Sequence, residues 1–357
     1  ALSAEMEHIW EVIVDDMAYP QPENADRWKF NVYIGDTGGG VPSAEGNAGY
    51  FWYDSENFPM IVLSKEIISW TDSAKLTGAH EFYHAVQAAV NTYNFNNAAL
   101  WWHEATANWI LEEVYRSDGG YSNTLYSVAL RPEIALNHWG DYATEGIEAD
   151  HHYGASIFGT FLSEHRGGWQ LIQRSFTEAP MNADPLDVFE TLLQEQGESL
   201  ADAHLEYALR NTTWDYEFER DYELSVADYS GDGESHRSSG TINDLSEDWQ
   251  GPGDWPPHTY GSNSWALENL PSELRLEFDG DAGITWRVGI ANQDGSEHKR
   301  WLMPAGSSSW ELSDFEVGDE AWLVVAAIHD NADDGETHSY QFRFVEPVEE
   351  VKGGCAS

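Results

Sequence analysis

The segment His80-Glu81-Phe82-Tyr83-His84 combines residue types that can bind a metal ion and use it. On a helix, side chains four positions apart project from the same face, so His80 and His84 would lie one above the other. Two imidazoles placed in this way can share one zinc ion, and Glu81 can act as general base on a water at that ion. Because so short a string also arises by chance, the surrounding sequence must supply the rest of a site.

A second helical segment offers a third ligand in Glu104. Residues 91–97 include four asparagines, which is typical of a turn, and a helical pattern resumes at Ala98. With Asn94 as the apex, His84 and Glu104 are each ten residues away, so an antiparallel helix pair would bring them level. Three protein ligands with a position left for water are typical of a catalytic zinc site.

Other residues near this pair are poorer ligand candidates. Glu112 and Glu113 lie about 12 Å further along the second helix. His103 is adjacent to Glu104 but projects about 100° away around the helix. Asn108 lies one turn after Glu104, and we expect its side chain to support that carboxylate.

The elements that would position these residues predict an α+β chain. A helical pattern over 5–17 is followed by strand patterns at 28–34, 49–53 and 60–63, which predict a small sheet before the metal motif. Further helices are expected at 71–91, 99–116, 122–138, 153–166, 168–176, 185–196 and 199–210. Strand patterns return at 274–278, 285–290, 299–303, 321–328 and 339–345, with acidic, glycine-containing turns between them. These short runs predict an antiparallel sandwich.

These patterns divide the chain into four parts. Residues 1–215 are expected to form a mainly helical domain with a small N-terminal sheet, and residues 256–348 an all-β sandwich domain. The intervening residues 216–255 are rich in Gly, Ser, Asp and Pro, which predicts a linker or long loops. Residues 349–357 are expected to be a tail.

The net charge of −46, from 63 acidic and 17 basic residues, limits the partners of this protein. Phosphates would be repelled, so nucleic acid is excluded as a partner and anionic membrane surfaces are disfavoured. We interpret the charge as adaptation to salt and expect a marine or halophilic bacterium. No apolar run approaches the roughly 18 residues of a transmembrane helix. No basic-then-apolar leader opens the sequence, which fits either a cytoplasmic protein or the mature form of an exported one.

The motif at 80–84 and the string Trp101-Trp102-His103-Glu104-Ala105-Thr106-Ala107 resemble those of the gluzincins, the group containing thermolysin and the aminopeptidase-N type enzymes. More narrowly, the chain resembles a family of secreted metalloproteases inferred from myxobacterial genomes, through residues 79–87, Tyr153-Gly154 and Tyr260-Gly261-Ser262-Asn263. This resemblance implies a gluzincin-type catalytic domain and a secreted or cell-surface location. It also implies that His80, His84 and Glu104 bind Zn²⁺, while Glu81 assists the attack of a zinc-bound water on a peptide or protein substrate.

The resemblance also suggests a donor for the oxyanion that forms during hydrolysis. Tyr153 corresponds to the tyrosine of the aminopeptidase-N type helix, and His151 and His152 are the alternatives. Endopeptidase activity is the first expectation. The string Tyr53-Asp54-Ser55-Glu56-Asn57 leaves aminopeptidase activity as an alternative, because such enzymes have a Glu-Asn pair at a similar distance before the zinc-binding helix. A non-catalytic surface or adhesion protein with a metal site is the alternative from another class.

Two further features of the sequence have weaker implications. Acidic turns such as 279–281 and 330–336 are candidates for structural Ca²⁺, but none reproduces a complete calcium loop. The only cysteine, Cys355, stands in a terminal Gly-Gly-Cys string, which is either an unused tail or a processing and anchoring remnant. This string resembles the start of a myxobacterial sorting signal. The sequence carries no signal for the oligomeric state.

The charge gives a first prediction. Because salt screens the repulsion among carboxylates, the melting temperature should rise steeply between about 0.1 M and about 2 M sodium chloride. Thermal unfolding followed by circular dichroism at several salt concentrations measures this effect. A melting temperature indifferent to salt would contradict the interpretation as salt adaptation.

Overall fold

The structure is a computed structural model of the 357-residue chain and describes residues 2–90, 93, 97–116, 120–143, 145–313, 315–329 and 335–347. Its helices and strands occupy separate parts of the chain, so the fold is α+β, as expected. Three sequence predictions lie outside the described residues. These are the turn apex at Asn94, the acidic segment 330–334 and the tail at 349–357 with Cys355.

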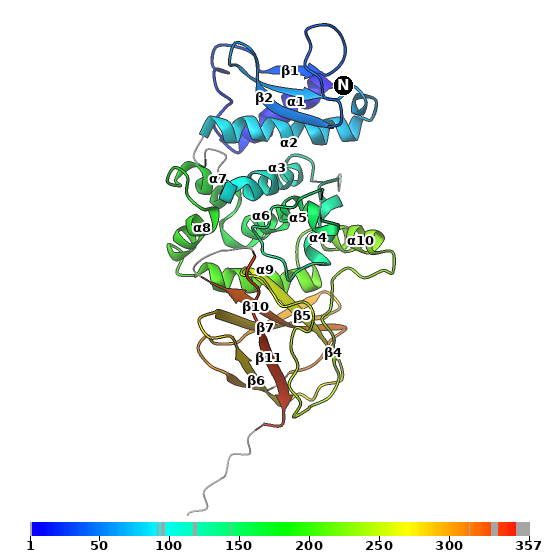
Figure 1. Ribbon diagram of the computed structural model, residues 1–357, viewed down its shortest axis with the longest axis vertical. Coiled ribbons are helices and arrows are strands. Elements are labelled where there is room, and N and C mark those ends of the chain that lie inside the picture. Colours follow the sequence, from blue (N-terminus) through cyan, green and yellow to red (C-terminus); the bar gives the residue numbers. More distant parts are fainter. Residues whose placement is uncertain are drawn as a thin grey trace, which may run out of the picture. The chain divides into compact units, whose positions relative to one another are not determined.

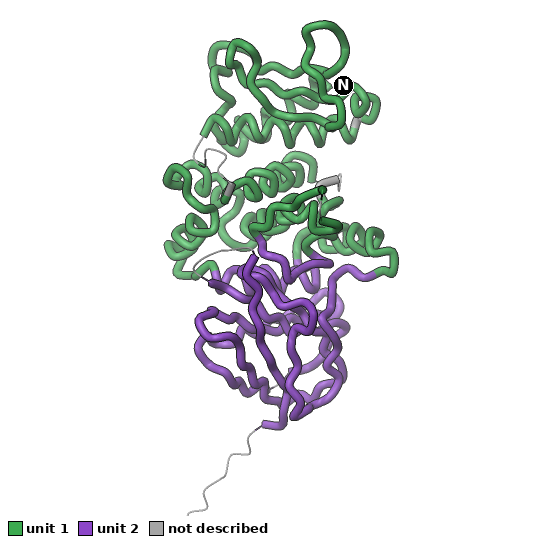
Figure 2. The backbone as a smooth tube through the Cα atoms, viewed as in Figure 1, with its two compact units in different colours: residues 1–128, 137–200, 216–233 green, residues 129–136, 201–215, 234–357 purple. Residues whose placement is uncertain are grey.

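The chain forms two compact units, shown in Figure 2. The first consists of residues 1–128, 137–200 and 216–233. The second consists of residues 129–136, 201–215 and 234–357. The structure therefore divides the chain differently from the expected boundaries at 215 and 256, and each unit is built from segments that are far apart in the sequence.

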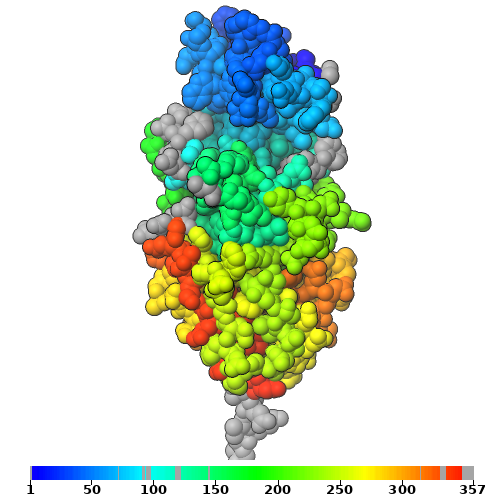
Figure 3. All heavy atoms as spheres, turned by 45° about the vertical axis from the view of Figure 1, so that its right-hand side comes forward, coloured from blue at the N-terminus to red at the C-terminus, as the bar shows by residue number. Residues whose placement is uncertain are grey.

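The first unit combines a small mixed sheet with most of the helices (Figure 1). Strands β1 (Asn31–Ile34) and β3 (Pro59–Leu63) run parallel, and β2 (Gly49–Tyr53) pairs antiparallel with β3 and forms an edge of the sheet. The helices are α1 (Leu2–Trp10), α2 (Thr71–Val90), α3 (Leu100–Val114), α4 (Tyr126–Ala129), α5 (His151–Gly154), α6 (Ser156–Leu162), α7 (Trp169–Thr177), α8 (Pro185–Gln194) and α10 (Glu219–Ser230). In Figure 3 the atoms of the N-terminal sheet and its loops are blue.

Helices α2 and α3 form the centre of the first unit. Helix α2 packs against β2, β3 and α3, and α3 also packs against α5 and α6. Buried residues occur on all sides of α3, including Trp101, Trp102 and Trp109, as expected for a helix within a core. A Cβ atom at Gly159 of α6 would lie only 2.8 Å from Cγ of Trp109, so this glycine permits the close approach of α6 to α3. Helix α3 is therefore enclosed by close contacts on several sides.

The pattern over 122–138 does not give the helix that its apolar spacing predicts. The segment contains a 3-10 turn (Gly120–Thr124) and the single turn of α4, and it is not helical from residue 130 onward. Proline at 132 accounts for the interruption, because it lacks a backbone N–H and clashes with the preceding turn of a helix. Residues 129–136 instead join the second unit.

The second unit is a two-layer β structure with one helix. Its five-stranded sheet has the order β4-β5-β10-β7-β8, and its three-stranded sheet the order β11-β6-β9. The strands are β4 (Thr241–Ile242), β5 (Gly261–Leu267), β6 (Leu274–Gly280), β7 (Thr285–Asp294), β8 (Glu297–Leu302), β9 (Ser309–Leu312), β10 (Glu320–Ile328) and β11 (Tyr340–Val345). Apolar residues of both sheets share one core, among them Leu276, Ile290, Leu323 and Phe342.

Helix α9 (Leu200–Thr213) packs on the other face of the five-stranded sheet. Its Leu205 and Leu209 form a small cluster with Ala291 of β7 and Val324 of β10. Because side chains alternate between the faces of a strand, these two strand residues point away from the main core. This contact places α9 with the β unit rather than with the preceding helices.

The segment expected as a linker contains α10 and β4. Only Tyr222 and Val226 of α10 are buried, so the apolar face of this helix is narrow. The acidic residues around these two positions obscure the helical pattern in the sequence. Within the part of the chain that the structure describes, no helix is both long enough and apolar enough to cross a membrane.

The packing of α6 on α3 gives a stability prediction. The substitution Gly159→Val places methyl groups where even a Cβ would be 2.8 Å from Trp109. We expect the free energy of unfolding to fall by about 1–3 kcal/mol, the usual effect of overpacking a core. The midpoint of urea denaturation measures it. Gly38→Val is the matched control, because a Cβ at Gly38 meets nothing within 4 Å, and equal destabilisation by both variants would contradict the argument.

Candidate metal centre

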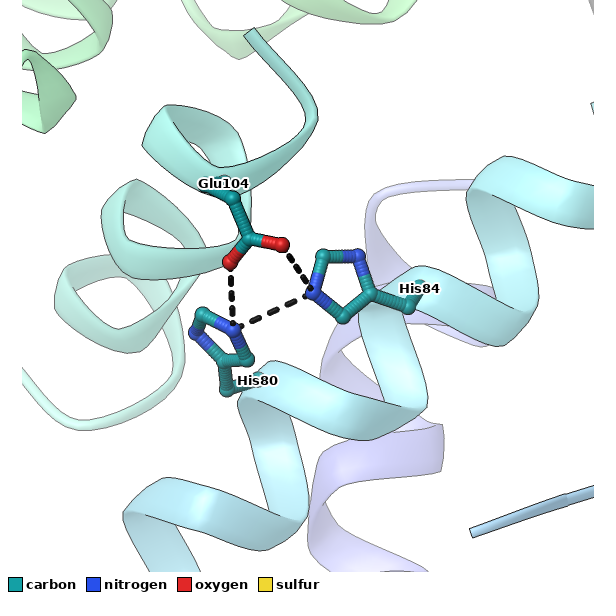
Figure 4. Close-up of side chains that lie close together, drawn as sticks. All are labelled: His80, His84 and Glu104. Atoms are coloured by element: carbon teal, nitrogen blue, oxygen red, sulfur yellow. Dashed lines mark hydrogen bonds and ion pairs between the residues drawn. The ribbon is translucent and has the colours of Figure 1, made fainter. Parts of the chain in front are cut away.

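Three side chains from α2 and α3 converge on one point (Figure 4). The Nε2 atoms of His80 and His84 are 3.1 Å apart. The two oxygens of Glu104 lie 3.1 Å from Nε2 of His80 and 3.5 Å from Nε2 of His84. Ligands about 2.0–2.2 Å from a tetrahedral zinc ion lie about 3.2–3.6 Å from one another, so this spacing suits one ion.

The orientation of His84 is set by Gln87, which lies one turn further along α2. Nε2 of Gln87 donates to the backbone carbonyl of His103 and to Oγ1 of Thr106, both at 2.9 Å. Its Oε1 therefore faces Nδ1 of His84 at 2.7 Å and accepts a hydrogen bond from it. Since Nδ1 carries the hydrogen, Nε2 of His84 directs a lone pair toward the metal position.

Asn108 orients His80 in the same way. Its Nδ2 donates to Oγ1 of Thr124 and to the backbone carbonyl of Tyr153, each at 3.4 Å. Its Oδ1 then accepts from Nδ1 of His80 at 3.0 Å. We expected Asn108 to support Glu104, but the side chain supports His80 on the facing helix.

The electrostatics of the site favour a cation between these groups. Burial disfavours the charged form of His84, but the Glu104 carboxylate outweighs burial and raises the pKa of His84 to about 9. Burial likewise disfavours ionised Glu104, yet His84 and His80 hold the pKa of its carboxyl well below the ordinary value. A centre that binds a proton this strongly also suits a metal ion, which would compete with that proton. The donor set of two imidazoles and one carboxylate therefore fits zinc.

The candidate centre opens into a cavity of about 440 Å³. Glu81 and Tyr153 line this cavity together with the three candidate ligands, and all five residues of β2 form another wall. Glu81 is only 8% exposed. The ring of Tyr153 lies 6.1 Å from that of His80, measured between centroids. Burial and the Glu104 carboxylate raise the pKa of Tyr153, so its hydroxyl stays protonated and can donate a hydrogen bond.

The other candidates for the oxyanion donor are engaged elsewhere. His151 is buried, and its Nδ1 lies 3.2 Å from the carbonyl of Ser127. Nδ1 of His152 accepts from the backbone N–H of Gly140 at 3.3 Å, and burial lowers the pKa of His152 to about 4. Neither residue lines the cavity at the metal centre.

The remaining acidic candidates also lie apart from the centre. Glu112 accepts from Thr160 at 2.7 Å, and Glu113 accepts from Ser163 at 3.0 Å. His103, in contrast, lines the cavity and contacts Oε1 of Gln87 at 3.1 Å through Nδ1. Burial and neighbouring His84 lower the pKa of His103 to about 3, so it remains neutral.

Gln87 was not among the functional residues expected from the sequence. The only available signal was its spacing, since a residue three positions after His84 lies on the same helix face. Nothing in the sequence indicates that its amide bridges His84 of α2 to His103 of α3. That role depends on the distance between two helices, which the sequence does not specify.

The contact between Asn108 and His80 gives a prediction about metal affinity. Leucine at 108 removes the acceptor that keeps hydrogen on Nδ1 of His80, and the imidazole can then carry it on Nε2 instead. We expect Asn108→Leu to weaken zinc binding about 10–100-fold, measured by competition with a chelating dye. Asn108→Asp restores an acceptor and should recover most of the affinity.

The matched control is Asn123→Leu, at an exposed asparagine of the first unit. This variant should bind zinc like the wild type. Undiminished zinc affinity of Asn108→Leu would show that Asn108 does not orient His80.

Comparison with known proteins identifies the family of the chain but not an activity. No curated protein matches the sequence at a significant level. A family model described as a family of unknown function, DUF6055, matches residues 1–312. This match spans the metal centre and most of the β unit, and it covers more than half of the chain. The chain therefore belongs to the DUF6055 family.

Proposed function

We propose that this protein is a zinc metallopeptidase of the gluzincin type that hydrolyses peptide bonds. The observation that carries the proposal is the convergence of His80, His84 and Glu104 at a cavity that Glu81 and Tyr153 also line. A structural zinc site is typically closed by four protein ligands, whereas this one offers three and opens to a cavity. The strongly acidic composition supports an exported protein of a saline environment.

The residues of the cavity have the chemistry that peptide hydrolysis needs. When bound, zinc would act as a Lewis acid on the scissile carbonyl and would make water more acidic. Glu81 takes a proton from the attacking water and passes it to the leaving amine. Tyr153 donates a hydrogen bond to the carbonyl oxygen as negative charge develops there. Asn108 and Gln87 keep the two imidazoles in the orientation that the site requires.

The position of β2 supports an extended peptide as substrate. This strand is at the edge of the three-stranded sheet, so one side of its backbone is available to pair with an added strand. The same strand lines the cavity at the metal centre. A peptide paired along Gly49–Tyr53 would pass the candidate ligands with its backbone held by hydrogen bonds, whatever its side chains.

The loop after β2 supports an endopeptidase over an aminopeptidase. Glu56 is exposed, lies in the tight turn between β2 and β3, and does not line the metal cavity. Oδ1 of Asp54 accepts from the backbone N–H groups of Glu56 and Phe58, each at 2.9 Å, and this closes the turn. This placement of Glu56 in the turn supports the interpretation of the Glu-Asn pair as part of a loop, and with it the proposal of an endopeptidase.

The central test is the substitution Glu81→Gln. It removes the general base but leaves the candidate ligands in place, so zinc stoichiometry should stay at one while peptidase activity falls about 10²–10⁴-fold. Zinc content by atomic emission and cleavage of casein or a quenched fluorescent peptide measure the two quantities. In the wild type, a chelator should abolish cleavage and added zinc should restore it.

Glu56→Gln is the matched control for this variant. The endopeptidase proposal predicts unchanged kinetics, whereas an aminopeptidase that used Glu56 would show a raised KM for substrates with a free amino terminus. Activity that survives Glu81→Gln would contradict the mechanism. A protein that binds one zinc ion but neither cleaves peptides nor binds hydroxamate inhibitors would favour the alternative of a non-catalytic surface protein.

A further inference from the structure

The β unit has a cavity of its own, which shares no lining residue with the cavity at the metal centre. Its volume is about 540 Å³, and it is lined by residues 249–253, Pro256, Asp281 and residues 337–341. All of these residues belong to the second unit. Cavities of roughly 300–1,000 Å³ are the usual size of sites for small ligands.

One wall of this cavity is Trp249, which is 40% exposed. The guanidinium of Arg343, on β11, packs over the indole ring at 4.7 Å from its centroid. Nε and Nη2 of Arg343 donate to Oε2 of Glu277, on the paired strand β6, at 2.8 and 2.7 Å. Its Nη1 donates to the carboxylate of Glu247 at 2.9 Å. Because two carboxylates hold this guanidinium, the indole is supported in one orientation while part of its surface stays open to the cavity.

The backbone on both sides of Trp249 is bound to β11. The N–H of Ser246 donates to the carbonyl of Phe344 at 2.8 Å. Gln250 and Phe342 exchange two backbone hydrogen bonds, both of 2.8 Å. This pairing fixes the position of the indole. It also occupies the edge of β11 here, so an extended peptide could not add to the sheet as a further strand at this point.

Polar side chains of the cavity can bind hydroxyl groups. Gln341 projects from the same face of β11 as Arg343, because side chains alternate along a strand. Its Nε2 donates to Oδ2 of Asp279 at 3.1 Å, which leaves Oε1 without a partner among the described residues. Oδ2 of Asp281 accepts from the backbone N–H of Ser339 at 2.6 Å, and Oδ1 has no hydrogen bond within the described part of the chain. Two oxygen acceptors are therefore available to a ligand.

The charge of the cavity favours a neutral ligand. Among the described residues that line it, Asp281 is the only carboxylate, and there is no lysine or arginine. His338 is buried, and burial lowers its pKa, so the ring is uncharged at neutral pH. A phosphate, sulfate or uronate group would meet a carboxylate and no cation. One carboxylate is also too few ligands for a calcium ion.

We propose that this cavity binds hexose units of a neutral polysaccharide. The C–H groups on one face of a pyranose ring are apolar and can lie flat on the indole of Trp249. The hydroxyl groups at the edge of the same ring can donate to Oε1 of Gln341 and Oδ1 of Asp281. A protein partner would need a wider apolar surface, whereas Trp249 is the only exposed large apolar residue among the described lining residues. This inference does not depend on the proposed peptidase function.

Isothermal titration calorimetry of the full chain with cellohexaose, laminarihexaose and mannohexaose tests the proposal. The salt concentration is one at which circular dichroism shows a folded chain. At least one hexasaccharide should bind with one site per chain. Trp249→Ala should weaken that binding by about 10-fold or more, since truncation of a central tryptophan removes the stacking surface. An alginate hexamer, which is anionic, should bind more weakly than the neutral sugar.

The matched control is Trp255→Ala. Trp255 is also 40% exposed, but the guanidinium groups of Arg131 and Arg237 lie 4.7 and 4.0 Å from its ring, and it does not line the cavity. This variant should bind the hexasaccharide like the wild type. Gln341→Ala changes an exposed residue and should weaken binding about 5-fold through the lost hydrogen bond.

Three results would overturn the proposal. These are the absence of binding by all three neutral hexasaccharides, tighter binding of the alginate hexamer, and an affinity that Trp249→Ala does not change. If Trp249→Ala does not fold, Gln341→Ala decides, and an unchanged affinity then refutes the site. Because the measurement is of sugar binding and not of cleavage, its outcome is separate from that of the Glu81→Gln experiment.

Discussion

Two imidazole nitrogens 3.1 Å apart, with lone pairs directed at the same point as a carboxylate, repel one another unless a proton or a metal cation lies between them. The helix core holds them there nevertheless. Trp101, Trp102 and Trp109 bury α3 on several sides, and Gly159 lets α6 press against it. The amides of Gln87 and Asn108 remove the other possible tautomer of each histidine. The packing energy of the first unit therefore maintains an arrangement that a bound cation would relieve.

The sequence predicted the core of this arrangement because the relevant geometry is local. Four-residue spacing on a helix and equal distances from a turn brought His80, His84 and Glu104 together without knowledge of the tertiary fold. It did not predict which amide supports which histidine. Asn108 lies one turn from Glu104 along α3, but the gap to α2 is short enough for its Oδ1 to reach His80.

The domain boundaries show a second limit of prediction from sequence. An amphipathic pattern shows that a helix has an apolar face, but not which core that face joins. Helix α9 follows directly after helices of the first unit, yet Leu205 and Leu209 pack on the β unit. Conversely, α10 was not expected, because its stretch of the chain has the composition of a linker. Only two of its residues, Tyr222 and Val226, are buried. The fold class can be predicted from the order of helical and strand patterns along the sequence. The division of the chain into two units depends on long-range packing, which those patterns do not specify.

The open edge of β2 has a consequence for how copies of this protein behave in solution. Within the described residues, β2 pairs with β3 on one side only, and such an edge strand, here carrying Phe51 and Trp52, is a template for pairing with any extended chain, including another molecule of the same kind. In dilute salt the charge of −46 keeps such molecules apart. Concentrated salt removes that barrier. The edge proposed to receive a substrate would then also be open to a second molecule, and the two would compete for one strand.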